Sequence, residues 1–123
     1  MTIRSILIII ITAVAFAGCA KPPLAELEAA RYLVHHAAEV GAANWSPGEY
    51  QLARAALETA EKQMDSQQYR AAARTISLAQ RYAEEARRES EYALARQAEL
   101  ERQLAEKARL QEEQRLRELA AQE

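Results

Sequence analysis

The chain has 123 residues, with 18 acidic and 16 basic side chains and a formal net charge of −2, and both signs are interleaved along its length. This near balance leaves no basic face of the kind that binds nucleic acid, so we expect no nucleic acid partner. Beyond residue 18, the β-branched aliphatic residues are Val34, Val40 and Ile76 alone. Because strands are rich in β-branched and aromatic residues, the composition argues against a sheet and predicts an all-α protein of single-domain size.

An apolar N-terminal run ends in small residues and a cysteine. Arg4 precedes the apolar residues 6–17, which is the organisation of a secretory signal peptide. The end of this run resembles the lipobox of bacterial lipoproteins, and the residues that carry the resemblance are Ala15, Phe16, Ala17, Gly18 and Cys19. The resemblance implies cleavage after residue 18 and a lipid on Cys19. A diacylglycerol there would anchor the chain firmly, since two acyl chains make membrane attachment stable.

Two other interpretations of this segment stay open. Residues 3–20 approach the roughly 20 apolar residues of an uncleaved transmembrane anchor. Ordinary signal cleavage could also leave Cys19 unmodified, and as the sole cysteine it cannot form an intramolecular disulfide. In bacterial lipoproteins an Asp after the cysteine indicates inner-membrane retention, and Ala20 stands here instead. The resemblance therefore implies a bacterial cell envelope protein, anchored to the outer membrane and facing the periplasm.

The next residues predict a tether and a helical hairpin. Residues 19–23 form the lipidated tether, which Pro22 and Pro23 stiffen. Residues 24–43 place apolar side chains at helical spacing and predict a first helix. Ser46 and Glu49 predict a capping box around Pro47, in which each side chain accepts a hydrogen bond from the other residue's backbone N–H. So short a connection makes the first two helices antiparallel neighbours.

A third amphipathic segment completes the expected bundle. The second helix should end near Met64, and Asp65 or Ser66 should cap a third that begins near Gln67. The three helices give a small antiparallel bundle over residues 24–89, with a thin core. The inner face of the third helix has heptad spacing and consists of Ile76, Ala79, Ala83, Ala86, Ser90, Ala93, Gln97, Leu100 and Leu104.

The third helix is expected to continue far beyond the bundle. Residues 67–121 contain neither Gly nor Pro, and such a length without caps indicates a coiled coil or a free-standing helix. Beyond Leu104 the heptad register fails. Pairs of opposite charge at i,i+4 persist along the helix, each worth about 0.2–0.5 kcal/mol. They are Arg81–Glu85, Glu84–Arg88, Arg87–Glu91, Arg102–Glu106, Arg109–Glu113 and Glu113–Arg117. Residues 90–123 are therefore either a solvated helical extension or a weak coiled coil that binds a partner or itself.

No residue pattern points to catalysis. His35 and His36 are adjacent and point about 100° apart on a helix, so they cannot bind one metal ion from one face, and we expect no metal site. The carboxylate pairs lie beside arginines on solvent faces, and no nucleophile motif or phosphate-binding loop is present. We therefore expect that the protein is not an enzyme. We also expect that it binds no small-molecule substrate and carries no cofactor other than the lipid. We expect the aromatic side chains to pack at the edges of the bundle. The alternative is contact with a partner, for which the candidates are Trp45, Tyr69 and Tyr82.

Several segments resemble an uncharacterised family of Ala-rich helical lipoprotein domains from bacterial envelopes. The resemblance covers residues 24–98 and rests on residues 24–27, 41–47, 50–53 and 69–72. It implies envelope location and a helical fold. A weaker resemblance, through Asp65, Tyr69 and the Ala72-Ala73 pair, is to tetratricopeptide helix pairs, although only one partial repeat is present.

The sequence thus divides into a signal peptide (1–18), a lipidated tether (19–23), a bundle (24–89) and a charged extension (90–123). We expect a membrane-anchored periplasmic lipoprotein that acts as a scaffold or adaptor, binding a protein partner or itself through the C-terminal helix. The alternative is a tetratricopeptide-like module that binds a peptide or an envelope enzyme.

Overall fold

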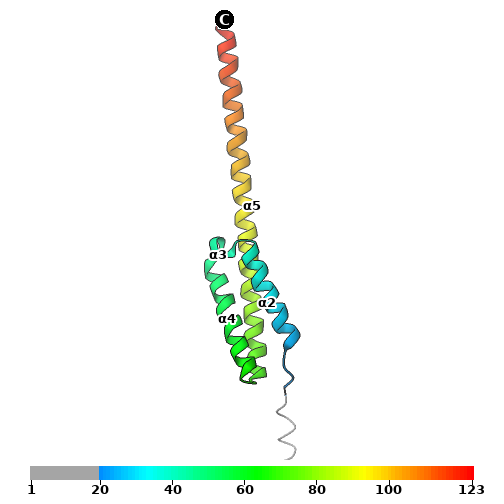
Figure 1. Ribbon diagram of the computed structural model, residues 1–123. Helices are drawn as coiled ribbons and strands as arrows, with labels where there is room; N and C mark the ends of the chain where they lie inside the picture. Colours follow the sequence, from blue (N-terminus) through cyan, green and yellow to red (C-terminus); the bar gives the residue numbers. More distant parts are fainter. Residues whose placement is uncertain (1–19) are drawn as a thin grey trace, which may run out of the picture.

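The computed structural model describes residues 20–123, and this part of the chain is all-α, without a strand (Figure 1). The helices are α2 (Leu24–Glu39), α3 (Ala42–Trp45), α4 (Pro47–Asp65) and α5 (Tyr69–Ala121). Helices α2 and α4 both pack against the first half of α5, and α5 then continues alone beyond them (Figure 1). The expected all-α bundle with a long third helix is confirmed. The predicted signal peptide, the predicted lipobox and Cys19 lie outside the described residues.

The first helix ends earlier than expected, because the chain turns at a glycine. Helix α2 stops at Glu39 rather than near residue 43. Gly41 follows with φ of +82°, a left-handed conformation that glycine adopts without steric cost, and its N–H donates to the carbonyl of Ala38 at 3.0 Å. The single-turn helix α3 then fits between α2 and α4, so the hairpin connection contains an additional helical element.

The turn between α4 and α5 uses a backbone motif instead of the expected side-chain cap. Helix α4 ends at Asp65, and Gln67 has φ of +58°. The N–H of Gln68 donates to the carbonyl of Gln63 at 2.8 Å, and that of Gln67 to Met64 at 3.0 Å. These two bonds form a Schellman motif with Gln67 as its left-handed residue. Neither Asp65 nor Ser66 caps α5, whose N-cap position is Gln68.

The core is narrow because alanine dominates it. The inward face of α5 is fully buried from the start of the helix to the top of the bundle, through Ala72, Ile76, Ala79, Ala83, Ala86 and Ser90. It meets Leu27, Ala30, Val34 and Ala37 of α2 and Ala53 and Ala60 of α4. Ile76 is the largest hydrophobic side chain that is completely enclosed. Small side chains let the helix axes approach closely but bury little apolar surface, so the bundle is of modest stability.

Polar contacts between helices fix the bundle from outside. The Arg31 side chain on α2 bonds Glu61 of α4 through Nε at 2.8 Å and also contacts Glu28. Hydrogen bonds to these two carboxylates, Glu61 first, raise the pKa of Arg31. Gln80 of α5 donates through Nε2 to the backbone carbonyl of Glu26 at 3.0 Å. These contacts hold α2 against both other helices near the tether end.

Beyond the bundle, α5 stands free of the other described helices. Its last fully buried residue is Ser90, and the residues after 93 are exposed. At about 1.5 Å per residue, the 53 residues of α5 extend for about 80 Å. The start of α2, with residues 20–23, lies at the opposite end of the molecule from the C-terminus (Figure 1). Within residues 20–123, no helix is both long enough and apolar enough to cross a membrane.

Candidate interaction surface

No group of three or more histidines, cysteines and carboxylates comes together within residues 20–123 to hold a metal ion. His35 faces Glu39 of the same helix, with Nε2 3.4 Å from the carboxylate. The His36 ring stacks on Tyr32, with the ring centroids 5.9 Å apart. Both histidines therefore take part in contacts within α2.

Trp45 forms a ledge where α5 leaves the bundle. The left-handed turn at Gly41 directs α3 toward α5, and the Trp45 ring covers Gly41, where a Cβ atom would lie 3.2 Å from Cδ1 of the indole. Trp45 is 41% exposed. Beside it lies an open, apolar hollow of about 290 Å³, lined by Trp45, Ala93, Arg96, Gln97 and Leu100. The hollow lies at the base of the extension.

A buried serine joins this ledge to α5. Ser46 is the N-cap residue of α4 and Pro47 its first residue, as the sequence predicts, but the reciprocal capping bonds are absent. The Ser46 hydroxyl instead lies 3.0 Å from Oε2 of Glu49 and in close contact with Oε2 of Glu89 on α5. Because the hydroxyl carries one proton, both carboxylates share it as a donor. Glu89 was not expected here, since it lies 43 positions away in sequence and no local pattern indicates the contact.

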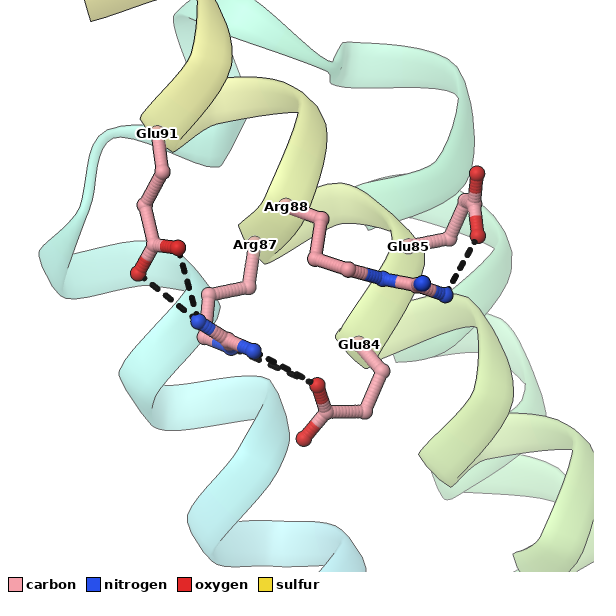
Figure 2. A network of polar contacts seen from close by, with 5 residues as sticks. All are labelled: Glu84, Glu85, Arg87, Arg88 and Glu91. Carbon is pink, nitrogen blue, oxygen red and sulfur yellow. Dashed lines mark hydrogen bonds and ion pairs between the residues drawn. The ribbon is translucent and has the colours of Figure 1, made fainter. Parts of the chain in front are cut away.

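Charged side chains reinforce α5 at the same level (Figure 2). Arg87 lies between Glu84 and Glu91, bonding the first through Nη2 at 3.0 Å and the second through Nη1 at 2.8 Å. These carboxylates, Glu84 before Glu91, raise the pKa of Arg87. Arg88 forms a separate pair with Glu85 at 3.0 Å. The helix is thus stiffened where the other helices end, through i,i+3 and i,i+4 pairs that need no core.

Leucines of the extension are exposed in the single chain. Leu100 is 57% and Leu104 67% exposed, although both continue the heptad positions that are buried below Ser90. Further along the helix, Leu110, Leu116 and Leu119 are also about half exposed. The face that α2 and α4 cover in the bundle is therefore uncovered above Trp45.

The three aromatic residues predicted to contact a partner do not share one surface. Trp45 lies at the top of the bundle, whereas Tyr69 lies at the tether end and lines a second hollow with Pro22, Leu24, Leu27 and Met64. Tyr82 is half-buried between them, packed against the cluster of Val34, Ala53 and Ala83. The guanidinium of Arg81 lies over its ring at 5.5 Å from the centroid. Only Trp45 adjoins the extension.

Comparisons with protein-family models, curated proteins and solved structures find no match for this chain.

Proposed function

We propose that the protein is a lipid-anchored periplasmic scaffold of the bacterial cell envelope, which holds a protein partner at a distance from the outer membrane. The observation that carries the proposal is the placement of the tether and the extension at opposite ends of the molecule (Figure 1). A chain attached through Cys19 would place α5 so that its free half points away from the membrane. Its tip would then stand about 80 Å from the bundle's lower end.

The composition of the described surface supports an interaction protein. The hollows are open and lie on the outside of the helices, and the ionised side chains pair with each other along α5. A catalytic acid or base needs a desolvated site that shifts its pKa. We therefore propose a protein without enzymatic activity, nucleic acid partner or small-molecule substrate, whose one attached group is the lipid on Cys19.

The anchor is tested by replacing its attachment atom. Cells expressing the wild-type chain or Cys19→Ser are labelled with an alkyne fatty acid and separated into membrane and soluble fractions. We expect label and membrane retention for the wild type, and no label on Cys19→Ser. Cys19→Ala repeats the result with a smaller side chain. A wild-type chain that carries no label contradicts the proposal.

The scaffold is tested by crosslinking in cells from Gln97 and Gln114, both on the extension. A photoreactive residue at either site should capture a discrete protein, identified by mass spectrometry. The matched control is the same residue at Thr59, on the outside of α4 in the bundle. Equal capture from Thr59 and from the extension, or no capture from any site, contradicts the scaffold.

The tetratricopeptide-like alternative gives a different result. The hollow beside Tyr69, about 410 Å³ in volume and bordered by Leu24 and Met64, is the feature that favours a bound peptide. A peptide-binding module would keep its partner when the chain is cut after Ala98. It would lose the partner in Tyr69→Ala or Tyr82→Ala, whereas a scaffold would behave in the opposite way.

A further inference from the structure

We propose that the tether end of the bundle docks on the lipid surface, with the apolar part of the hollow beside Tyr69 in the headgroup layer. The surface concerned is called the end face here. Its residues come from the start of α2, the end of α4 and the start of α5, and they are Pro22, Leu24, Met64 and Tyr69. The proposal rests on the proposed function, because it takes the lipid to be on Cys19.

The end face is apolar and partly open to solvent. Leu24 is the first residue of α2 and is 61% exposed, and Pro22 before it is exposed as well. Met64 and Tyr69 are half-buried, and with Leu24 they border the hollow. The start of α2 and the turn between α4 and α5 lie at the same end of the molecule, next to residues 20–23 (Figure 1). The apolar surface therefore lies where the chain leads toward the anchor.

The tether is too short to hold the end face clear of a membrane. The three residues from Ala20 to Pro22 span at most about 10 Å when fully extended. The headgroup layer on each side of a bilayer is about 5–8 Å thick, since the hydrocarbon core measures about 30 Å and the whole bilayer about 40–45 Å. With the acyl chains of Cys19 in the core, Pro22 lies within the headgroup layer or directly above it.

The tether also selects which apolar surface meets the lipid. The hollow beside Trp45 is apolar too, but it lies beyond the other end of α4. The 19 residues of α4 extend for about 28 Å, which is well beyond the span of the tether. The end face is therefore the apolar surface that the anchor brings into the headgroup layer.

The side chains of the end face suit the boundary between lipid and water. Tyrosine is enriched at this boundary, because its ring is apolar and its hydroxyl group is polar. Tyr69 has its ring against the hollow. The exposed Leu24 side chain gains free energy when it leaves water, and the headgroup layer is the apolar environment within its reach.

Charge does not oppose the docking. Near the end face, Lys21 and Arg70 accompany Glu28 and Asp65, so neither sign is in excess. Arg31 lines the inner part of the hollow and pairs with Glu28. The contact is therefore mainly apolar, and we expect it to form equally on neutral and on anionic lipid and to persist in high salt.

Docking gives the scaffold a direction. A lipid on one residue fixes where a rod is attached, but the rod can still tilt about that point. A second contact at the end face removes this freedom. Because α2 and α4 both pack against the first half of α5, an upright bundle points the free half of α5 away from the membrane.

The docking is tested with the lipidated full chain in phosphatidylcholine vesicles. Because Cys19 carries the lipid, a new cysteine is the one free thiol and takes a nitroxide label. We compare Ser66→Cys, in the turn between α4 and α5, with Asn44→Cys, which is exposed on α3. The label at Ser66 should collide more with oxygen, which enriches in lipid, and less with a water-soluble nickel complex. The label at Asn44 should behave as in water.

A pair of leucine variants shows whether the end face makes the contact. Leu24→Glu should return the Ser66 label to the behaviour of the Asn44 label, and α2 should remain folded because acidic residues suit the first turn of a helix. The matched control is Leu52→Glu, at a leucine that is 48% exposed on the side of α4. Equal results for Leu24→Glu and Leu52→Glu overturn the assignment of the end face.

The direction is tested by energy transfer from a fluorophore at Gln114→Cys to an acceptor in the membrane. Transfer should be low in the wild-type background and should rise at least twofold with Leu24→Glu, because a tilting rod brings its tip closer to the lipid. Unchanged transfer contradicts the upright bundle.

The outcomes separate this inference from the proposed function. A chain that carries no lipid overturns both. A lipidated, membrane-bound chain whose Ser66 label meets the nickel complex as freely as the Asn44 label overturns the docking and leaves the anchor standing. A photoreactive residue at Ser66 should crosslink to lipid in cells. Crosslinks to a protein instead would assign the hollow to a peptide and overturn the inference.

Discussion

Ser46 connects three elements through one hydroxyl group. It ends α3, begins α4 and contacts Glu89 on α5, and its side chain is buried. A hydrogen bond to a carboxylate contributes about 1.5–3 kcal/mol, more than a neutral one. The hydroxyl lies between the carboxylates of Glu49 and Glu89, which belong to different helices. The serine therefore holds the Trp45 ledge against the base of the extension.

We expect Ser46→Ala to lower the free energy of unfolding by about 2 kcal/mol, since it removes the donor that both carboxylates share. Urea unfolding followed by circular dichroism measures the change. Ser77→Ala is the matched control, because the Ser77 hydroxyl is exposed and bonds only its own helix at Ala73. Equal stability of Ser46→Ala and the wild type would show that the contact with Glu89 contributes nothing.

The buried alanines set how closely the helices approach. Ala83 is completely enclosed, between Val34 of α2 and Ala53 of α4. We expect Ala83→Leu to destabilise the bundle by about 1–3 kcal/mol, because a larger side chain there forces the helices apart. Ala95→Leu is the control at an exposed position of the same helix. Thermal melting distinguishes the two, and a stabilised Ala83→Leu would mean that the core holds unfilled space.

The buried face of α5 could be predicted from spacing. The heptad positions from Ile76 to Ser90 are all buried. The same rule continues to Leu104, which is exposed because no described helix covers it. Periodicity reports which side of a helix is apolar. It does not report where the covering helices end.

At the scale of helices, the α4–α5 turn carries a local strain. Gln67 has a left-handed backbone, which costs a residue with a Cβ atom about 1–2 kcal/mol. We expect Gln67→Gly to stabilise the protein by about 1 kcal/mol, since glycine is the favoured residue of the Schellman motif. Gln63→Gly, inside α4, should destabilise it by a similar amount. A lower melting temperature for Gln67→Gly would mean that the turn is formed differently.

Helix α4 should respond to acid through one surface pair. Lys62 donates to Glu58 at 2.7 Å and lowers the pKa of this carboxyl below its usual value. Because the folded pKa is the lower one, the pair stabilises the fold above the unfolded pKa, and this contribution is lost as pH falls through the folded pKa. The wild type should therefore melt above Glu58→Gln at neutral pH, and this difference should disappear in acid.

Salt provides the control for this pair. Both side chains are exposed, so screening at high ionic strength should remove the difference between the wild type and Glu58→Gln at neutral pH. A difference that persists in high salt and in acid would come from helix propensity instead of charge.

Helix ends were harder to predict than helix interiors. The break near Asn44 and Pro47 was predicted, but the single turn α3 was not, because it depends on the left-handed backbone of Gly41. Charge pairs show the same limit. Arg87–Glu91 and Glu113–Arg117 form at i,i+4 as expected, whereas Arg102 and Arg109 bond Glu99 and Glu106 at i,i+3. Spacing permits both partners, and side-chain rotamers decide between them.

At the scale of the whole molecule, the residues that stabilise the fold and the residues that give the molecule its length lie in different parts of the chain. Residues that stabilise the bundle end at Ser90, and the extension relies on its own hydrogen bonds and ion pairs. A helix of this length without a packed face is held by local terms alone, so it should open from the tip at lower temperature than the bundle. The bundle should therefore not depend on the extension.

Truncation separates the two parts. Ending the chain after Ala98 should leave the cooperative melting of the bundle in place, because the lost residues bury no core. In the full chain, a gradual loss of helix signal should occur at temperatures below the cooperative melting of the bundle. This gradual loss should be absent from the chain that ends after Ala98. Ending the chain after Ala83 is the control, since it removes the buried Ala86 and Ser90 and the Glu89 contact with Ser46. If the Ala98 truncation melts as early as the Ala83 truncation, the extension is part of the folded unit, and α5 acts as one cooperative rod from the tether end to the tip.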